Sequence, residues 1–271
     1  MRALLPPVSE PTPEPTETPP PRTLNVDLLP RRSGGEDAAA YQDVVVLVDV
    51  LRTTTTVPIL FDRGLVRLRL SPSLRRARRV ADEDGDLLIG ERRGVPPEGF
   101  NHGNSPATLA LRDLGGRSAL MVSENAPAAL PHLAGARVVL LASLVNAQAA
   151  ARLAAERAQT RIDLVCCGFR GEPDLDDLMT AGCLVDRLLR LRPDLVPAGA
   201  ARLALDLMRS EADPLSLLWS SRAGRYLRRL GLERDLGTAA DLDRSTVVPV
   251  LGAPESRHGG MLFPFAPADA D

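Results

Sequence analysis

The sequence of 271 residues predicts an α/β fold, a three-layer α/β/α sandwich built around a mainly parallel, mixed sheet. Short apolar segments rich in Val, Ile and Leu alternate along the chain with longer segments of helical periodicity. Parallel strands need crossover connections, usually helices, so this alternation favours a parallel sheet with helices on both faces. We expect a single domain over residues 23–250, between a disordered Pro-rich tail at 1–22 and a loosely ordered C-terminal tail at 251–271.

The apolar segments are predicted to be strands because they are rich in β-branched residues or alternate apolar with polar residues. They cover residues 23–29, 44–48, 65–70, 87–89, 118–122, 137–142, 162–167 and 246–250. The segment VVVLV at 44–48 contains no polar residue, which is typical of a buried strand. The residues that follow it, from Asp49 to Thr56, are predicted to form a polar loop.

The segments between the strands carry signals for the start and end of helices. Ser105 is an N-cap followed by Pro106 at the first helical position, and Gly64 and Gly231 are suited to end helices. The predicted helices cover residues 58–62, 72–82, 105–113, 126–133, 143–159, 174–191, 198–209 and 214–230. Residues 90–104 are predicted to be a long loop punctuated by Gly and Pro, of the kind that tends to carry sites.

The composition excludes several classes of function. The 33 basic and 35 acidic residues leave a net charge of −2, so we expect no nucleic acid and no membrane as partner. Every basic residue is Arg, which excludes Walker-type phosphate loops, pyridoxal enzymes and Schiff-base aldolases, all of which need Lys. We expect Cys166, Cys167 and Cys183 to be reduced thiols. With no apolar run that could span a membrane and no signal-peptide pattern, a cytoplasmic location is expected.

Polar side chains follow three of the predicted strands, at the sheet edge where open α/β folds bind ligands. Carboxylates suit a hard cation such as Mg²⁺, whereas guanidinium groups, hydroxyls and helix N-termini suit phosphate or sulfonate oxygens. The first cluster holds Asp49, Arg52, Thr53, Thr54 and Thr55, the second Glu91 and Arg92, and the third Arg170, Asp176 and Asp177. Together these clusters predict a site that handles a phosphate group.

Three common phosphatase signatures do not fit the chain. The haloacid-dehalogenase pattern needs a second Asp at the position of Leu51. A cysteine phosphatase needs Arg at a fixed spacing after the nucleophile, and neither Cys166 nor Cys167 has one there. The Arg-His-Gly triplet at 257–259 spells a histidine-phosphatase signature, but no predicted strand leads into it.

Three segments, in order, resemble the 2-phosphosulfolactate phosphatase family (ComB type). They are VVVLVDVLRTTTTV, LLIGERRGVPPEGFNHGNSP and CCGFRGEPDLDDLMTAG, which match the family patterns DVLRATTT, GER with GF and GNSP, and G-x-x-G with an acidic pair and AG. The resemblance spans residues 49–182. It implies a Mg²⁺-dependent hydrolase that releases phosphate from 2-phosphosulfolactate and leaves sulfolactate.

Roles for the clustered residues follow as a hypothesis. Asp49, Glu91 and Asp177, together with Asp176, would hold Mg²⁺, and the metal would polarise the phosphoryl group. The groups that would bind the small anionic phosphorylated substrate, or orient it, are Arg52, Arg92, Arg170, Thr53, Thr54, Thr55, Asn104 and Asn125. Asp49, Arg52, Glu91 and Asp177 are the candidate catalytic residues. Attack by water and attack by a carboxylate both remain open.

The chain departs from the family pattern at two places. Residues 123–127 read SENAP where the family has TTNGT, so only Asn125 is retained, and Asn101 replaces an Asp. These departures leave two alternatives: a phosphatase for another small phosphorylated acid, and a non-catalytic descendant that binds an anionic metabolite or a protein partner. A homodimer is expected only from the general frequency of dimers among enzymes of this size.

Overall fold

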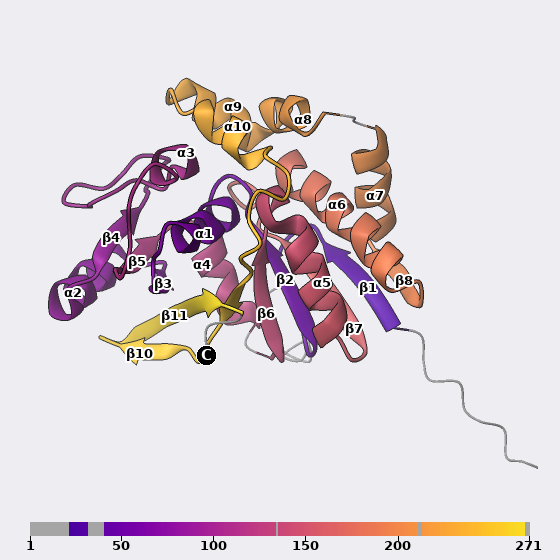
Figure 1. Ribbon diagram of the computed structural model, residues 1–271, viewed down its shortest axis with the longest axis horizontal. Helices are drawn as coiled ribbons and strands as arrows, with labels where there is room; N and C mark the ends of the chain where they lie inside the picture. Colours follow the sequence, from indigo (N-terminus) through magenta and orange to yellow (C-terminus); the bar gives the residue numbers. More distant parts are fainter. Residues whose placement is uncertain (1–21, 32–40, 134, 211–212, 269–271) are drawn as a thin grey trace, which may run out of the picture.

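The computed structural model describes residues 22–31, 41–133, 135–210 and 213–268 (Figure 1). In these residues one mixed sheet of 11 strands has helices around it, and most neighbouring strands in it are parallel. The predicted α/β fold with a mainly parallel, mixed sheet is confirmed. The predicted disordered tail lies outside the described residues except for Arg22, which begins the first strand.

The sheet contains two groups of parallel strands joined by antiparallel ones. The strand order is β4-β5-β3-β11-β9-β6-β2-β7-β1-β8, with β10 paired to β11. Strands β9 and β11 are antiparallel to each other and to β6 and β3, the strands that they join. The strands are β1 (Arg22–Asp27), β2 (Val44–Val48), β3 (Arg67–Ser71), β4 (Leu87–Gly90), β5 (Ser118–Val122), β6 (Val138–Ala142), β7 (Arg161–Cys166), β8 (Leu195–Gly199), β9 (Pro249–Leu251), β10 (Glu255–Arg257) and β11 (Gly260–Pro267).

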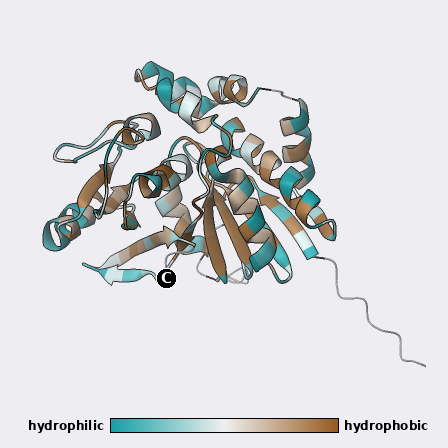
Figure 2. Ribbon diagram, viewed as in Figure 1, coloured by the Kyte–Doolittle hydropathy of each residue, from teal (hydrophilic) through white to brown (hydrophobic). Residues whose placement is uncertain are grey.

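Helices pack on both faces of β2, the strand that leads to Asp49. Val44, Val46 and Val48 belong to an apolar cluster with α5 and α6, whereas Val45 and Leu47 belong to a second cluster with α1 and α4. The central strands β2 and β6 are accordingly apolar along their length, while the outer faces of the helices are polar (Figure 2). The helices are α1 (Thr53–Asp62), α2 (Leu74–Asp84), α3 (Pro106–Leu109), α4 (Ala126–Ala129), α5 (Ala147–Arg157), α6 (Leu175–Leu191), α7 (Ala201–Ser210), α8 (Pro214–Ser220), α9 (Arg222–Arg229) and α10 (Arg234–Ala239).

The threonines at 53–56 form the first turn of α1, so the prediction of a polar loop followed by a helix at 58 is wrong. Their β-branched side chains have low helix propensity, but all four are buried and their hydroxyls take up backbone groups at the helix start. Thr55 donates to the carbonyl of Val50 at 2.7 Å, and Thr56 donates to that of Arg52 at 3.0 Å. Tertiary contacts therefore override local propensity here.

The C-terminal segment is also different from the prediction. Residues 260–267 form β11, which lies between β3 and β9, so the expectation of a loosely ordered tail at 251–271 is wrong for this part. Phe263 and Phe265 are buried in the apolar cluster around α1. The prolines at 264 and 267 hide the strand from a sequence reading, because Pro is rare within sheets.

The C-terminal helices lie above the carboxyl ends of the central parallel strands (Figure 1). The predicted helix at 214–230 is divided at Ser221, whose hydroxyl caps the start of α9 by accepting from Gly224 N–H at 2.9 Å. Strand β8 and helix α10 were not predicted, and β8 occupies the residues where a helix was expected to begin. The break at Ser221 matters because it orients α9 separately from α8.

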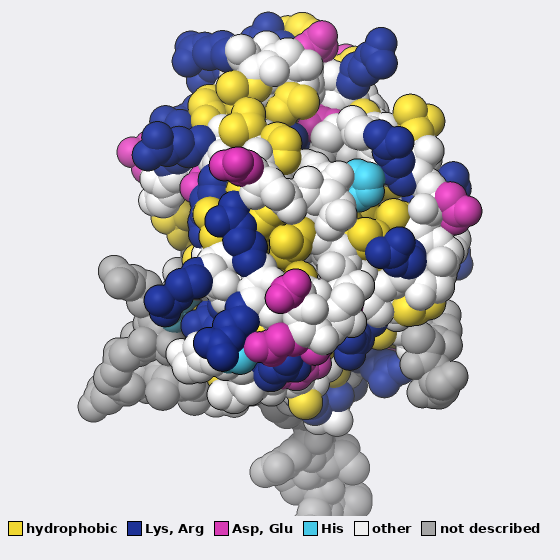
Figure 3. All heavy atoms as spheres, turned by 90° about the vertical axis from the view of Figure 1, so that its left-hand side faces the viewer, with side chains coloured by type: hydrophobic (Ala, Val, Ile, Leu, Met, Phe, Trp, Pro, Cys, Tyr) yellow, Lys and Arg dark blue, Asp and Glu magenta, His cyan; other side chains and the backbone are white. Residues whose placement is uncertain are grey.

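Figure 3 shows a face on which Arg side chains are interspersed with acidic ones. On α2, Arg79 pairs with Glu83 at 3.3 Å, and Arg257 of β10 pairs with both Glu83 and Asp84. These ion pairs lie on the solvent-exposed face of α2. The three cysteines are free, and among the described residues every helix is too short or too polar to span a bilayer.

We expect Phe265→Ala to lower the free energy of unfolding by about 3–5 kcal/mol, because it removes a ring that is 1% exposed from a strand inside the sheet. The measurement is equilibrium denaturation by urea. Met261→Ala in the same strand is the matched control, because its side chain is 40% exposed, and its effect should stay within about 1 kcal/mol. Equal effects of the two substitutions would contradict the place of β11 in the core.

Candidate functional site

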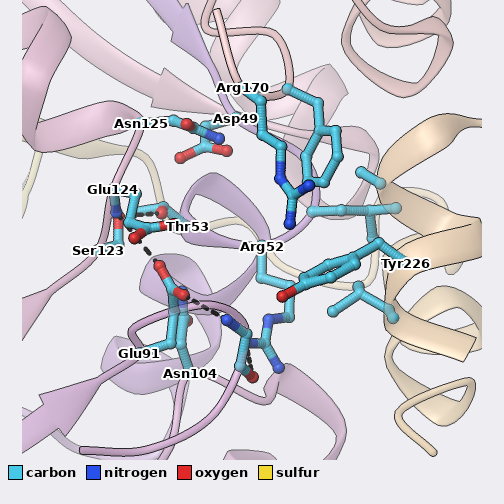
Figure 4. A pocket seen from close by; sticks show the side chains of 15 residues that line it. Asp49, Arg52, Thr53, Glu91, Asn104, Ser123, Glu124, Asn125, Arg170 and Tyr226 are labelled. Carbon is cyan, nitrogen blue, oxygen red and sulfur yellow. Dashed lines mark hydrogen bonds between the residues drawn. The ribbon is translucent and has the colours of Figure 1, made fainter. Parts of the chain in front are cut away.

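A cavity lies where the loops after β2, β4, β5 and β7 meet α9 (Figure 4). Two pairs of parallel strands, β2 with β7 and β4 with β5, therefore deliver residues to it from their carboxyl ends, where open α/β folds generally bind ligands. Its lining residues are Asp49, Leu51, Arg52, Thr53, Glu91, Gly94, Asn104, Ser123, Glu124, Asn125, Phe169, Arg170, Ala223, Tyr226 and Leu227.

Asp49 lies directly after β2 and is 3% exposed. Its backbone N–H donates to the Thr54 hydroxyl at 3.0 Å, and its Oδ2 accepts from the N–H of Ala126 at 3.1 Å. Burial raises the pKa of the Asp49 carboxyl above its usual value. A buried carboxyl that faces a cavity and titrates high is a common property of functional sites.

Glu91 and Arg52 are connected through Gly94. The Glu91 Oε2 accepts from the N–H of Gly94 at 2.7 Å, and the Gly94 carbonyl accepts from Arg52 Nη2 at 2.7 Å (Figure 4). Gly94 has φ of 81°, a conformation that favours glycine, and an added Cβ would lie 2.4 Å from Leu230 Cδ1. Burial raises the pKa of Glu91 as well. The loop after β4 thus fixes an acid and a cation together.

Arg52 is held on its other side by an acid that sequence reasoning missed. Its Nη1 lies 3.0 Å from Asp235 Oδ2 on α10, and both side chains are almost fully buried. The other carboxylate oxygen of Asp235 accepts from the hydroxyl of Ser105 at 2.6 Å. The charge of Arg52 is therefore already balanced in part by Asp235 in the absence of a ligand.

The side chain of Arg170 packs against two adjacent aromatic rings, whose centres are 5.5 Å apart. Its guanidinium carbon is 5.1 Å from the ring centre of Phe169 and 4.8 Å from that of Tyr226. Within the described residues it makes no ion pair or hydrogen bond through its side chain. The cavity therefore contains one paired cation, Arg52, and one cation without an acidic partner, Arg170.

The segment at 123–127, where the chain departs from the family pattern, contributes mainly backbone groups. The N–H of Glu124 donates to Glu91 Oε1 at 3.2 Å, and that of Ala126 donates to Asp49. The Ser123 hydroxyl lies 2.8 Å from that of Thr53. Backbone bonds do not depend on side-chain identity, so the divergent sequence still supports both carboxylates.

The structure brings together seven of the predicted site residues: Asp49, Arg52, Thr53, Glu91, Asn104, Asn125 and Arg170 all line the cavity. The other predicted residues do not line it. Thr54 and Thr55 bond to the backbone of their own turn. Arg92 points to the carbonyl of Pro72 and lies 3.7 Å from Glu124.

Asp176 and Asp177 lie in the first turn of α6, behind the cavity. Asp177 accepts from the N–H of Val50 at 2.9 Å and from that of Gly168 at 2.8 Å, so both its oxygens are taken by the backbone. Asp176 is buried, and its Oδ1 has no partner. After burial, the charge of Asp49 is among the causes that raise the pKa values of both residues, so they lie near Asp49. Neither lines the cavity, however, and among the described residues no three acidic, His or Cys side chains form a metal-binding group.

Comparison with known proteins identifies the family. A family model described as 2-phosphosulpholactate phosphatase matches residues 32–254. The chain belongs to the 2-phosphosulfolactate phosphatase family. It is thus a member of a family of phosphoric monoester hydrolases.

Individual relatives agree with the family match, and each is named a probable 2-phosphosulfolactate phosphatase. The relative from Thermus thermophilus is 42% identical over 84% of this chain and 94% of its own length. The relative from Deinococcus radiodurans is 40% identical over 84% of this chain and 92% of its own length. One from a Synechococcus species is 34% identical over 76% of this chain.

The cavity residues fit Mg²⁺ through fewer ligands than the sequence predicts. Among the described residues no group of three His, Cys, Asp or Glu side chains is arranged to hold a metal by itself. Mg²⁺, however, is commonly bound by one or two carboxylates, with waters and substrate phosphate completing its coordination. Asp49 and Glu91 supply two carboxylates whose pKa values are raised by burial, and Asn104 has a buried Oδ1 without a partner. These three groups fit a hard cation.

Sequence reasoning missed the residues that hold the cavity residues in place. Tyr226 and Phe169 support Arg170, and Asp235 supports Arg52. Asp235 and Tyr226 come from the C-terminal helices, far along the chain from every motif. Phe169, in contrast, lies inside the segment CCGFRGEP that matches the family pattern, so the sequence alone could have indicated it.

We expect Asp177→Asn to lower the free energy of unfolding by about 2–4 kcal/mol, because an amide can accept only one of the two backbone N–H bonds. Burial raises the pKa of Asp177 to about 8, so the wild type loses stability as the pH rises toward that value. Denaturation by urea should therefore be measured at acidic pH, where this loss is small and does not mask the effect of the substitution.

Asp176→Asn is the matched control for this substitution. Its Oδ1 has no partner, so the change should not destabilise the protein. Burial also raises the Asp176 pKa, so the native state keeps a proton that the unfolded chain loses above about pH 4. Stability therefore falls as the pH rises, and Asp176→Asn should make that fall shallower. If only the Asp176 variant lost stability, this would contradict the role of Asp177 as acceptor of two backbone N–H groups and the finding that Asp176 Oδ1 has no partner.

Proposed function

We propose that this protein is a Mg²⁺-dependent phosphatase that hydrolyses the phosphate ester of 2-phosphosulfolactate to sulfolactate and phosphate. The observation that carries the proposal is that the buried carboxyls of Asp49 and Glu91 share one cavity with Arg170, a cation without an acidic partner. A cavity with acids for a metal and a free cation for an anion suits a substrate that carries several negative charges. Family membership supports the same reaction class.

Each group has a stated role in the proposal. Asp49 and Glu91 would hold Mg²⁺, which supplies polarisation of the phosphoryl group and neutralises charge as the ester bond breaks. Arg170 binds a second acidic group of the substrate, and the Thr53 hydroxyl donates to a phosphate oxygen. Asn104 orients water or substrate. In the overall reaction water supplies the new oxygen on phosphorus, and its proton goes to the sulfolactate oxygen that leaves.

The divergent residues favour an active site over a decayed one. Asn101 is exposed and accepts from Leu88 N–H at 2.7 Å, so the carboxylate missing at this position lies outside the cavity lining. The segment around Asn125 keeps its backbone bonds to Asp49 and Glu91. The predicted cytoplasmic location and homodimer also remain part of this proposal.

Glu124 favours a second candidate, a phosphatase for a smaller phosphorylated acid. Its side chain is 47% exposed, lines the cavity and lies 3.7 Å from Arg92. A third carboxylate in the cavity would disfavour a substrate with three acidic groups. Turnover of 2-phospholactate, which lacks the sulfonate, at a higher kcat/KM than that of 2-phosphosulfolactate would select this candidate.

The proposed reaction is tested by phosphate release from 2-phosphosulfolactate with Mg²⁺ and with a chelator. We expect release only with Mg²⁺, and Asp49→Asn should lower kcat/KM at least about 100-fold because it removes a metal ligand. Asp62→Asn, an exposed change at the end of α1, is the matched control and should keep full activity. Release that is unaffected by the chelator would contradict the metal, and absence of release would contradict the substrate.

Mg²⁺ affinity should depend on pH in a defined direction. Carboxylates bind the metal when deprotonated, and burial raises the pKa values of Asp49 and Glu91. Protons therefore compete with the metal as the pH falls through the raised values, and affinity should be weaker at an acidic pH than near pH 8. Titration calorimetry with MgCl₂ alone measures this. Equal affinity at both pH values, or an Asp49→Asn variant that binds as tightly as the wild type, would count against the assignment.

A further inference from the structure

The two cations of the cavity are in different electrostatic states. Arg52 is paired with Asp235 and also donates to the carbonyl of Gly94. Arg170 has neither kind of partner within the described residues and instead packs against the adjacent rings of Phe169 and Tyr226. Aromatic faces attract a guanidinium without neutralising it, so the full positive charge of Arg170 remains available to a ligand. Its direction is set by the rings (Figure 4).

Tyr226 is itself fixed at both ends. Its hydroxyl donates to the carbonyl of Arg93 at 2.8 Å, and its ring packs against the backbone of Gly94, where an added Cβ would lie 3.2 Å from Tyr226 Cε1. The ring also lies 5.5 Å, centre to centre, from that of Phe169. Tyr226 therefore joins the loop after β4, which carries Glu91, to the loop after β7, which carries Arg170.

The helix that carries Tyr226 is tied to the loop of Arg170. Asp174, at the end of that loop, caps α6 and also accepts from the first two N–H groups of α9, at 2.9 Å from Arg222 and 2.7 Å from Ala223. The side chain of Arg222 forms an ion pair with Glu172 in the same loop. These bonds fix helix α9 relative to the Arg170 loop. The contact between Tyr226 and Arg170 is therefore supported by the backbone on both sides.

We propose that Tyr226 is a positioning residue that holds Arg170 for an acidic group of the substrate beyond its phosphate and carboxylate, and that this pair selects substrates carrying such a further group. The inference rests on the proposed function. In 2-phosphosulfolactate the group is the sulfonate, a weakly hydrated anion that matches the planar guanidinium. Glu91 and Asp49 lie elsewhere in the cavity, where the metal and the phosphate would be bound.

The test compares 2-phosphosulfolactate with 2-phospholactate, which lacks the sulfonate, in four variants. Tyr226→Leu should lower kcat/KM for 2-phosphosulfolactate about 10- to 100-fold, mainly through KM, and that for 2-phospholactate by less than about 3-fold. Tyr226→Phe keeps the ring and should stay within about 3-fold of the wild type for both. Arg170→Met should show the same selectivity as Tyr226→Leu. The double variant should lose no more than about 3-fold beyond Arg170→Met, because Tyr226 acts through Arg170.

Trp219→Leu is the matched control. Trp219 stacks on Arg228 at 4.5 Å in the same group of helices but does not line the cavity, so neither substrate should be affected. Equal losses for the two substrates in Tyr226→Leu, or additive losses in the double variant, would show a merely structural role and overturn the inference.

Binding of products separates this inference from the proposed reaction. Calorimetric titration with sulfolactate and with lactate needs no turnover. If the wild type releases no phosphate, the proposed function fails, and the inference still predicts that sulfolactate binds more tightly than lactate and that Tyr226→Leu and Arg170→Met remove the difference. A wild type that binds the two ligands equally, or binds neither, would overturn it.

Discussion

The loops of the site depend on Asp177, a buried acid that does not itself line the cavity. Strands β2 and β7 are neighbours, and their parallel ladder ends where Cys167 N–H donates to the Val48 carbonyl at 2.8 Å. Beyond that bond the two chains diverge, and the next N–H groups, of Val50 and Gly168, have no strand partner. Asp177 accepts from both. Because a buried backbone N–H without a partner is costly, this carboxylate fixes the two loops that carry Asp49 and Arg170.

Most other connections in the site also join a side chain to a backbone group. Gly94 links Glu91 to Arg52 through its N–H and carbonyl, and the segment after β5 donates its N–H groups to Asp49 and Glu91. Such bonds constrain the path of the chain and leave the side chains of the segment free to change. Both carboxylates can therefore keep their donors although residues 123–127 differ from the expected family pattern.

The sequence was sufficient to predict the α/β class and the strands that lead to the cavity, because buried strands are apolar and polar residues follow them. It placed Asp49, Glu91 and Arg170 correctly at one edge of the sheet for the same reason. The sequence does not show in which direction an acidic side chain in the first turn of α6 points. Asp177 was therefore predicted to be a metal ligand, whereas the structure shows that it accepts from two backbone N–H groups. Sequence reasoning also missed β11, whose prolines obscure a buried strand, and Tyr226, a single aromatic residue on a polar helix that matches no motif.

Electrostatics support the proposed use of both a metal and Arg170, which has no acidic partner among the described residues. Burial raises the pKa of Asp49, although the nearby charge of Arg52 acts to lower it. Arg52 also forms an ion pair with Asp235, so its charge does not act on Asp49 alone. The acids of the cavity are therefore not neutralised by Arg52, and a cation from solution is the remaining source of positive charge for them. Arg170 does not serve them either, because Phe169 and Tyr226 hold it by their ring faces. Separate supports for the two arginines are therefore consistent with the proposed function, in which the acids would hold a metal and Arg170 would bind a substrate anion in the same cavity.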